Sequence, residues 1–372
     1  MTTIAATHRL FARRARMAGA VALSLGVAAC SSSFGVASPP SPTPPAPVNT
    51  VAPPVATTKG IDPLTGTAGE IGPAVAVKVA NTKEAWPQSG VSAADQVWVE
   101  EIEGGHLRLV AIYASSYPAK IGPVRSARET DIGLVPQFGK PGFAYAGADT
   151  PVLADIARAA TDGLLVDLGK DAKVGDTEVR GPSYSTDQAR SAPYNFYANG
   201  IALAGFASVG GAHPPASGGF AFGKAAAGSS PCTRLTATWA KPTTGGAHWD
   251  AASKSWVLEF DDKDLIDRET GKPLTATNVV VLRMYDSPST KDRSNYQVPV
   301  LESYAGAGGD AILMRGGRCT TGHWSRPTQT SPTTLTTSGG APLRLAPGRS
   351  WVFTVGIGPS LYDATERTAT TS

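Results

Sequence analysis

The chain has 372 residues, of which 17% are charged, and its formal net charge is +3. Four of its 33 basic residues and none of its 30 acidic residues fall in the first 29 positions, so the rest of the chain carries 29 basic and 30 acidic groups, a net charge of −1. This near-neutral balance argues against nucleic acid as a partner, because binding to phosphate backbones depends on a surplus of basic side chains.

Residues 1–29 have the three parts of a secretory signal peptide: a basic start, a short apolar run and small residues at the end. The apolar run would rise only about 20 Å as a helix, too short for a stable membrane span. It ends Val27-Ala28-Ala29-Cys30, which resembles the lipobox of bacterial lipoproteins, where the cysteine thiol is acylated. We therefore predict removal of residues 1–29 and a lipid anchor on Cys30 at the outer face of the cytoplasmic membrane. The Arg13-Arg14 pair leaves the general and the twin-arginine export routes both open.

Residues 30–60 are predicted to form a linker. From Ser31 to Gly60 the chain has eight prolines, one lysine and no acid. Such a segment has too little apolar mass for a core and favours extended polyproline conformations. At about 3.1 Å per residue it would hold the folded part several tens of Å from the membrane.

The rest of the chain is long enough for two domains and predicts an α+β protein, with a mixed α/β domain over 61–210. Strands are expected at 74–80, 96–103, 107–115 and 142–148. A helix is expected to start at Asp149 or Thr150, with Pro151 in its first turn and Gly163 at its end. A second helix is expected after Pro123, and a further one within 192–206.

Residues 213–230 are rich in glycine, proline, serine and alanine and mark the predicted domain boundary. The second domain, 231–358, is expected to be mainly β, with strands at 235–239, 255–260, 278–284, 296–302, 311–315 and 351–357. The tail, 359–372, is expected to be disordered.

With Cys30 committed to lipid, Cys232 and Cys319 remain, and two thiols in an oxidising compartment favour a disulfide. Two free buried cysteines are the alternative. Neither cysteine lies in a CxxC motif, and no histidine has a partner at metal-ligand spacing. We therefore predict neither a metal nor a cofactor.

An ordered set of motifs resembles the YerB-like bacterial lipoprotein family, known as the domain of unknown function DUF3048, with an N-terminal and a C-terminal module. The motifs are Ile61-Asp-Pro-Leu-Thr-Gly66, Trp86-Pro-Gln-Ser-Gly90, Ile121-Gly-Pro-Val-Arg-Ser-Ala-Arg128, Ala192-Pro-Tyr-Asn-Phe-Tyr197, Gly322-His-Trp-Ser-Arg326 and Leu345-Ala-Pro-Gly348. The resemblance covers most of 61–357 and implies a two-domain envelope lipoprotein, but it implies no reaction. Tyr194 stands where the family usually has histidine, which puts in doubt any mechanism that needs that histidine.

Two groups of charged residues are the candidate ligand site. If Gly104-Gly105 form a two-residue hairpin turn, Glu101 lies opposite Arg108, either as a cross-strand ion pair or as the polar floor of a cleft. If a helix begins near Val124, Arg125 and Arg128 share its first turn, where Ser126 could cap the helix or donate. That arrangement predicts either ion pairs with nearby acids (Glu101, Glu103, Glu129, Asp131) or an anion-binding site.

The leading hypothesis is an envelope lipoprotein that binds an anionic ligand, such as a cell-wall glycan or peptide, through Arg125, Arg128, Arg108, Ser126 and Glu101. One alternative is a hydrolase or transferase that uses paired carboxylates, such as Glu101 with Asp131 or Asp149. Another is an assembly role, in which the β-rich domain docks a partner protein of the envelope. No catalytic residue can be assigned, because the sequence contains no HExxH, GxSxG or P-loop motif.

Overall fold

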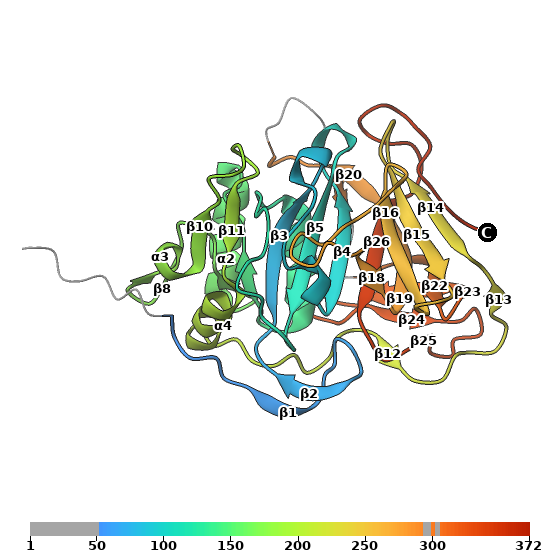
Figure 1. The fold of residues 1–372 in the computed structure, drawn as a ribbon, viewed down its shortest axis with the longest axis horizontal. Helices are drawn as coiled ribbons and strands as arrows, with labels where there is room; N and C mark the ends of the chain where they lie inside the picture. Colours follow the sequence, from blue (N-terminus) through green and yellow to red (C-terminus); the bar gives the residue numbers. More distant parts are fainter. Residues whose placement is uncertain (1–51, 293–298, 302–305) are drawn as a thin grey trace, which may run out of the picture. The chain divides into compact units, whose positions relative to one another are not determined.

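One mixed sheet of eleven strands draws on both predicted domains in the computed structural model, which describes residues 52–292, 299–301 and 306–372 (Figure 1). Its order is β13 (Ser230–Pro231), β23 (Arg318–Arg326), β22 (Ala307–Arg315), β19 (Asn278–Met284), β26 (Ser350–Gly356), β4 (Gln96–Glu101), β5 (Leu107–Tyr113), β3 (Val75–Asn81), β6 (Gly142–Ala144) and β7 (Val166–Asp167), with β24 (Thr334–Thr336) beside β23. The predicted signal peptide and Cys30 lie outside the described residues.

The two predicted domains meet inside this sheet, where β26 pairs in parallel with β4. Ser350 lies opposite Gln96 and Phe353 opposite Val99. The strands here are buried on both faces, which explains why their sequences read as continuous apolar runs without alternation. The boundary at 213–230 therefore separates stretches of sequence, but a single sheet continues across it, and the described residues belong to one compact unit.

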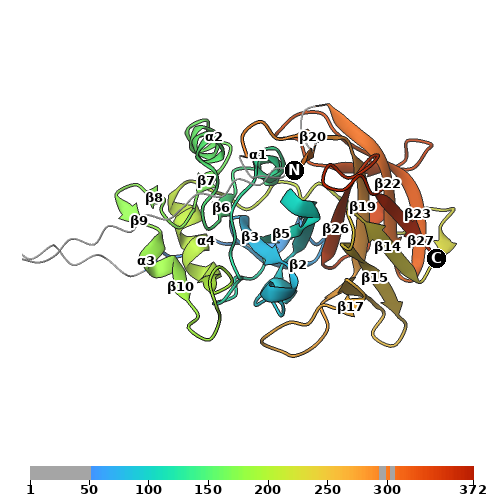
Figure 2. The same ribbon diagram turned by 90° about the horizontal axis from the view of Figure 1, so that it is seen from above.

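A second sheet covers one face of the first, as Figure 2 shows from above. Its order is β17 (Lys263–Asp264), β16 (Ser255–Phe260), β15 (Thr244–Asp250), β14 (Arg234–Thr238) and β27 (Thr368–Thr371), with β18 (Thr275–Ala276) beside β16. Trp239, Phe260 and Phe353 stack with ring centroids 6.0–6.4 Å apart and fill the space between the two sheets. Contacts of Trp239 and Phe260 with Phe353 thus join the small sheet to β26 of the large one.

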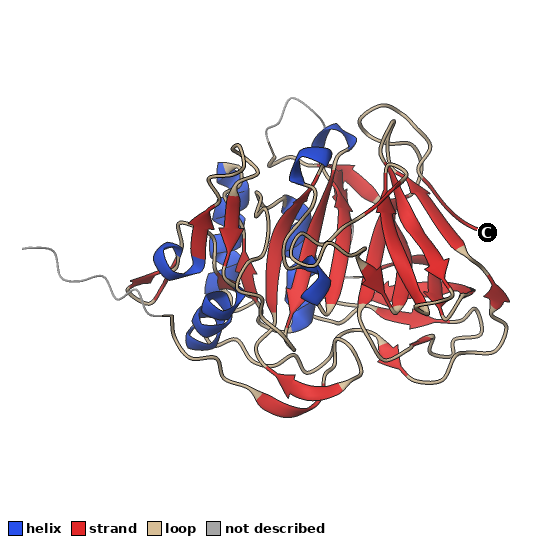
Figure 3. Cartoon of the chain, in the orientation of Figure 1, coloured by secondary structure: helices blue, strands red, loops and turns tan. Residues whose placement is uncertain are grey.

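Helices gather around the strands of the N-terminal half, whereas the other half is built from strands (Figure 3). α1 (Glu129–Leu134) and α2 (Thr150–Thr161) pack on one face of the large sheet, and α4 (Gly200–Val209) packs on the other. Asp149 is the residue before α2 and Pro151 lies in its first turn, as predicted. The predicted helix over 192–206 is displaced, because 196–198 form a strand and Asn199 caps α4 through its side chain. The predicted α+β class is confirmed.

Short elements complete the described chain. Five strand pairs are β1 (Thr58–Ile61) with β2 (Ala68–Ile71), β8 (Lys173–Val174) with β9 (Thr177–Glu178), β10 (Tyr184–Thr186) with β11 (Phe196–Ala198), β12 (Ala221–Phe222) with β25 (Arg344–Leu345), and β20 (Asp286–Pro288) with β21 (Pro299–Leu301). Single helical turns are α3 (Arg180–Ser183) and the 3-10 turns η1 (Lys83–Ala85), η2 (Val91–Ala93), η3 (Glu103–Gly105) and η4 (Val135–Phe138). Among the described residues, no helix combines the length and hydropathy that a membrane span requires.

Two predictions about the ends of the folded part are wrong, one for the C-terminal tail and one for the linker. The tail over 359–372 is not disordered, because β27 pairs with β14 and Arg367 is 2% exposed. The predicted linker over 30–60 ends early: Val55 packs against the core, and β1 begins at Thr58. The part of that linker before residue 52 lies outside the described residues.

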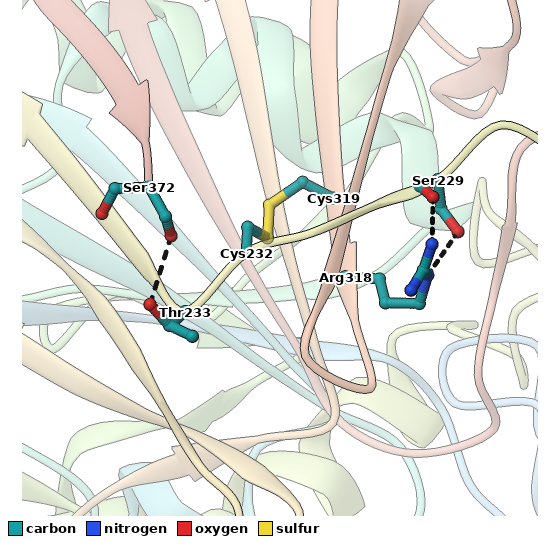
Figure 4. Close-up of a disulfide and its surroundings, with 6 residues drawn as sticks. All are labelled: Ser229, Cys232, Thr233, Arg318, Cys319 and Ser372. Atoms are coloured by element: carbon teal, nitrogen blue, oxygen red, sulfur yellow. Dashed lines mark hydrogen bonds between the residues drawn. A yellow bond between two sulfur atoms is a disulfide. The ribbon is translucent and has the colours of Figure 1, made fainter.

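The predicted disulfide is present between Cys232 and Cys319, whose Cα atoms are 5.7 Å apart (Figure 4). It links the segment after β13 to β23, at the end of the large sheet. Beside it, Arg318 Nε donates to Ser229 Oγ at 2.8 Å, and Thr233 Oγ1 donates to the carbonyl of Ser372 at 3.3 Å. The disulfide and the C-terminal residue thus lie next to each other.

Candidate functional site

The hairpin between β4 and β5 differs from its predicted register by one residue. The turn is the 3-10 turn η3, closed by a hydrogen bond from Ile102 N to His106 O, so Arg108 lies opposite Glu100 and not opposite Glu101. Gly104 and Gly105 both have positive φ, and a Cβ at Gly105 would lie 2.4 Å from the Cβ of Ala240. The predicted Glu101–Arg108 pair is therefore wrong.

Glu101 instead pairs with the C-terminal segment. Arg367 Nη1 donates to Glu101 Oε2 at 3.1 Å, and the same guanidinium binds both carboxylate oxygens of Asp286. Burial raises the pKa of Glu101 to about 7, despite the charge of Arg367. Glu101 therefore holds the tail to the sheet and does not line the ligand site.

The segment before α1 is extended, so the predicted helix near Val124 is wrong. Arg125 N donates to the carbonyl of Lys78, and α1 begins only at Glu129, with Arg128 as its N-cap. Because the backbone is extended here, Arg125 and Arg128 do not share a helical face. Their side chains have different partners.

Glu103 joins two of the three arginines. Arg128 Nε donates to Glu103 Oε2 at 2.6 Å, and Arg108 Nη2 donates to Glu103 Oε1 at 3.2 Å. Burial alone would raise the pKa of Glu103, but the bonds from Arg128 and the charge of Arg108 outweigh it and lower that pKa to about 2. Glu103, one of four acids considered from the sequence, is thus the internal counter-ion.

Arg125 is the arginine that remains without a carboxylate. Its guanidinium lies 5.5 Å from the ring centroid of Tyr194, and in the described part of the chain no carboxylate lies within ion-pair distance of it. Burial lowers its pKa, and the charge of Arg128 acts in the same direction. A half-buried guanidinium in this state favours an incoming anion.

Arg125 opens onto a pocket of about 270 Å³, which we call the arginine pocket. Arg108, 4% exposed, also lines it, and burial lowers the pKa of Arg108 to about 9. Ser126 contributes its backbone carbonyl, which accepts from Arg108 Nη1 at 2.6 Å. The pocket is also lined by Asn81, Glu84, Glu103, His106 and Tyr194. The structure thus brings Arg125 and Arg108 together in an open pocket, whereas Arg128 and Ser126 support them from outside it.

Sequence reasoning missed a fully buried ion network below this site. Lys78 Nζ donates to Glu100 Oε2 and, at 2.7 Å, to Asp131 Oδ1, and all three residues are 0% exposed. Asp131 Oδ2 accepts from Arg128 N at 2.6 Å. A lysine within the apolar run of β3 was the available signal. Asp131 is thus engaged with Lys78, and the predicted carboxylate pair of Asp131 with Glu101 is not formed.

A second missed cluster comprises His248, Glu259 and Asp264 on the small sheet, whose potential ligand atoms lie within 4.8 Å of one another. Arg234 already donates to both oxygens of Glu259, at 2.9 and 3.1 Å. A cation at this place would have to displace that guanidinium, so the cluster is best described as an ion-pair network.

Comparisons with known proteins give a family. Family models described as the N-terminal and C-terminal domains of a protein of unknown function, DUF3048, match residues 64–212 and 235–352. YerB of Bacillus subtilis (strain 168), a candidate lipoprotein by its name, is 50% identical over 60 residues, which are 16% of this chain and 18% of YerB. The crystal structure of B. subtilis YerB matches with a TM-score of 0.65 and 21% identity, covering 84% of this chain and 99% of that chain, which shows a common fold. Since the two family models together span most of the described residues, the chain belongs to the DUF3048 family, as its motifs predicted.

Proposed function

We propose that this protein is a lipid-anchored envelope protein that binds a small carboxylate-bearing ligand in the arginine pocket. The observation that most directly supports this proposal is that Arg125 lines the pocket without a carboxylate partner among the described residues. Glu103 satisfies Arg108 and Arg128 but leaves Arg125 to Tyr194. A guanidinium presents paired donors that match the two oxygens of a carboxylate, so the ligand would supply the missing negative charge.

The anchor places this pocket outside the cytoplasmic membrane. The Val27-Ala28-Ala29-Cys30 motif and the signal-like residues before it support this location, and a candidate lipoprotein among the relatives agrees with it. Mass spectrometry of native protein tests the anchor: we expect Cys30 as the first residue with an acyl adduct. An intact N-terminal methionine without an adduct would reject the anchor.

Calorimetry with soluble cell-wall fragments tests the pocket. We expect Arg125→Ala to abolish binding, since it removes the unpaired donor, whereas Arg180→Ala is the matched control because Arg180 is exposed and pairs with exposed Asp171. Equal binding by wild type and a folded Arg125→Ala variant would reject the site.

A further inference from the structure

A second pocket adjoins the arginine pocket. We call it the Trp86 pocket; its volume is about 150 Å³, and Trp86, Pro242 and Phe260 line it. The two pockets share the residues Asn81, Thr82, Glu84, His106 and Leu107. Ligand sites commonly measure about 300–1,000 Å³, so neither pocket alone reaches that range and both together do. A ligand that fills the site therefore extends past the shared wall.

Asn81 lies in that wall with an unused hydrogen-bond donor. Its Oδ1 accepts from Trp86 Nε1 at 2.8 Å and from Gln88 Nε2 at 2.9 Å. Because an indole N–H can only donate, these bonds fix which side of the amide is oxygen. Asn81 Nδ2 is left buried and has no partner among the described residues, and the residue is 5% exposed. Buried amide donors are nearly always satisfied in folded proteins, so this one points to an acceptor that arrives with a ligand.

The Trp86 pocket differs chemically from its neighbour. Apolar groups of Trp86, Leu107, Pro242 and Phe260 line it, and the ion pair Lys83–Asp261, at 3.2 Å, lies at its rim. Lys83 and Asp261 therefore neutralise each other, and Glu84, which also lines the arginine pocket, adds one carboxylate to the shared wall. The two pockets together thus offer a guanidinium in the arginine pocket, an amide donor in the shared wall and an apolar surface in the Trp86 pocket.

We propose that the ligand is an N-acylated amino acid, the unit found at the C-terminal end of a peptide. Its carboxylate lies against Arg125, its acyl carbonyl accepts from Asn81 Nδ2, and its acyl group enters the Trp86 pocket. This proposal rests on the anion site proposed above and names its ligand class. Because Asn81 Nδ2 is buried, the side chains that cover it must move when the ligand enters. The indole N–H of Trp86 donates to the same amide, so its chemical environment changes when the ligand binds.

NMR titration of the full-length lipoprotein in detergent micelles, labelled with ¹⁵N at the indoles, tests the proposal. The probes are propionate, which has only the carboxylate, N-acetyl-alanine, and 2-methylpentanoate, which keeps the carboxylate and the length but has two methylenes in place of the amide carbonyl and N–H. We expect N-acetyl-alanine to bind about fivefold more tightly than 2-methylpentanoate, the gain of one hydrogen bond. The Trp86 indole signal, assigned with Trp86→Phe, should move with N-acetyl-alanine and stay in place with propionate.

Asn81→Asp removes the donor and retains an acceptor for Trp86. The added charge weakens all three probes alike, so the ratio between N-acetyl-alanine and 2-methylpentanoate isolates the carbonyl contact. We expect this ratio to fall to about one. If Asn81→Asp does not fold, the comparison of the probes on wild type still decides the matter.

These measurements distinguish a wrong ligand class from a wrong anion site. Equal affinity for N-acetyl-alanine and 2-methylpentanoate, with both dependent on Arg125, would overturn the acyl amino acid and leave the anion site standing. Absence of binding by every carboxylate would overturn both. N-acetylglucosamine, which has the acyl amide without a carboxylate, should not bind; binding as tight as that of N-acetyl-alanine would show a neutral sugar ligand and overturn the proposal.

Discussion

Replacing Arg367 by methionine should remove the group that holds the C-terminal segment to the sheet. The Arg367 side chain is 1% exposed and lies between two carboxylates, Glu101 and Asp286, whose side chains are 2% and 3% exposed. Its Nη2 atom is 2.6 Å from Asp286 Oδ1. Methionine fills much of the space but leaves both acids buried without a counter-ion.

The expected loss of unfolding free energy is about 3–5 kcal/mol, the usual cost of removing one partner of a buried ion pair. Native domains have about 5–15 kcal/mol in total, so this loss would be about a fifth of the stability or more. Arg180→Met is the control, because Arg180 and Asp171 are 59% and 64% exposed and such pairs contribute about 0–1 kcal/mol.

Urea unfolding followed by tryptophan fluorescence measures both variants. Asp286→Asn in the Arg367→Met background should restore part of the loss, since it removes one uncompensated charge. If Arg367→Met unfolds within 1 kcal/mol of wild type, the C-terminal segment is not held as described, and the reasoning from burial is refuted.

Three further outcomes are expected. Burial raises the pKa of Glu101 from 4.5 to about 7, so between these pH values the folded protein keeps a proton that the unfolded chain releases. The stability that this proton contributes is complete below about pH 4.5 and is lost as the pH rises to 7. Melting scans at pH 5 and pH 8 should therefore show a smaller loss of stability in Glu101→Gln than in wild type, and an equal loss would contradict this sign. Cys232→Ser with Cys319→Ser should cost about 4–5 kcal/mol in urea unfolding, because the bridge closes a loop of 87 residues; an unchanged midpoint would show that the bridge contributes no stability. Glu103→Gln should tighten propionate binding roughly twofold or more in an NMR titration, because it removes the negative charge nearest the arginines, whereas weaker binding would mean that Glu103 itself positions the ligand.

The bounds of several strands and the start of α2 could be predicted from the local sequence. The strands at 255–260 and 278–284 have the predicted bounds, because their apolar runs are long and rich in β-branched and aromatic residues. α2 begins where its cap and Pro151 place it. These signals are local, so they survive without knowledge of tertiary contacts.

The errors arose where a distant segment decides the outcome. The Gly104-Gly105 turn has three residues instead of two, and this moves Arg108 from Glu101 to Glu100. The segment around Arg125 is extended because it bonds to Lys78, which is 47 positions earlier in the chain. Arg367 is buried because two acids from remote strands enclose it. The spacing of apolar residues within these segments does not indicate partners that lie far away in the sequence.

Arg125 and Arg108 line one pocket, although the predicted hairpin register and the predicted helix near Val124 are both absent. Their proximity comes from β3, which carries Lys78 and Asn81 and joins the extended segment to the hairpin. Trp86 lies in the Trp86-Pro-Gln-Ser-Gly90 motif, but nothing in the sequence connects that motif with Asn81, so the amide in the shared wall could be found only from the structure.

The parallel pairing of β26 with β4 has a consequence for dissection of this protein. Each half, expressed alone, would expose the unpaired edge of a strand that lies at the centre of the intact sheet, β4 in one half and β26 in the other, which favours aggregation. Proteolytic nicking within 213–230 should instead leave two fragments that stay associated and copurify. Separately produced halves should regain solubility only when they are mixed, in the manner of a split reporter protein.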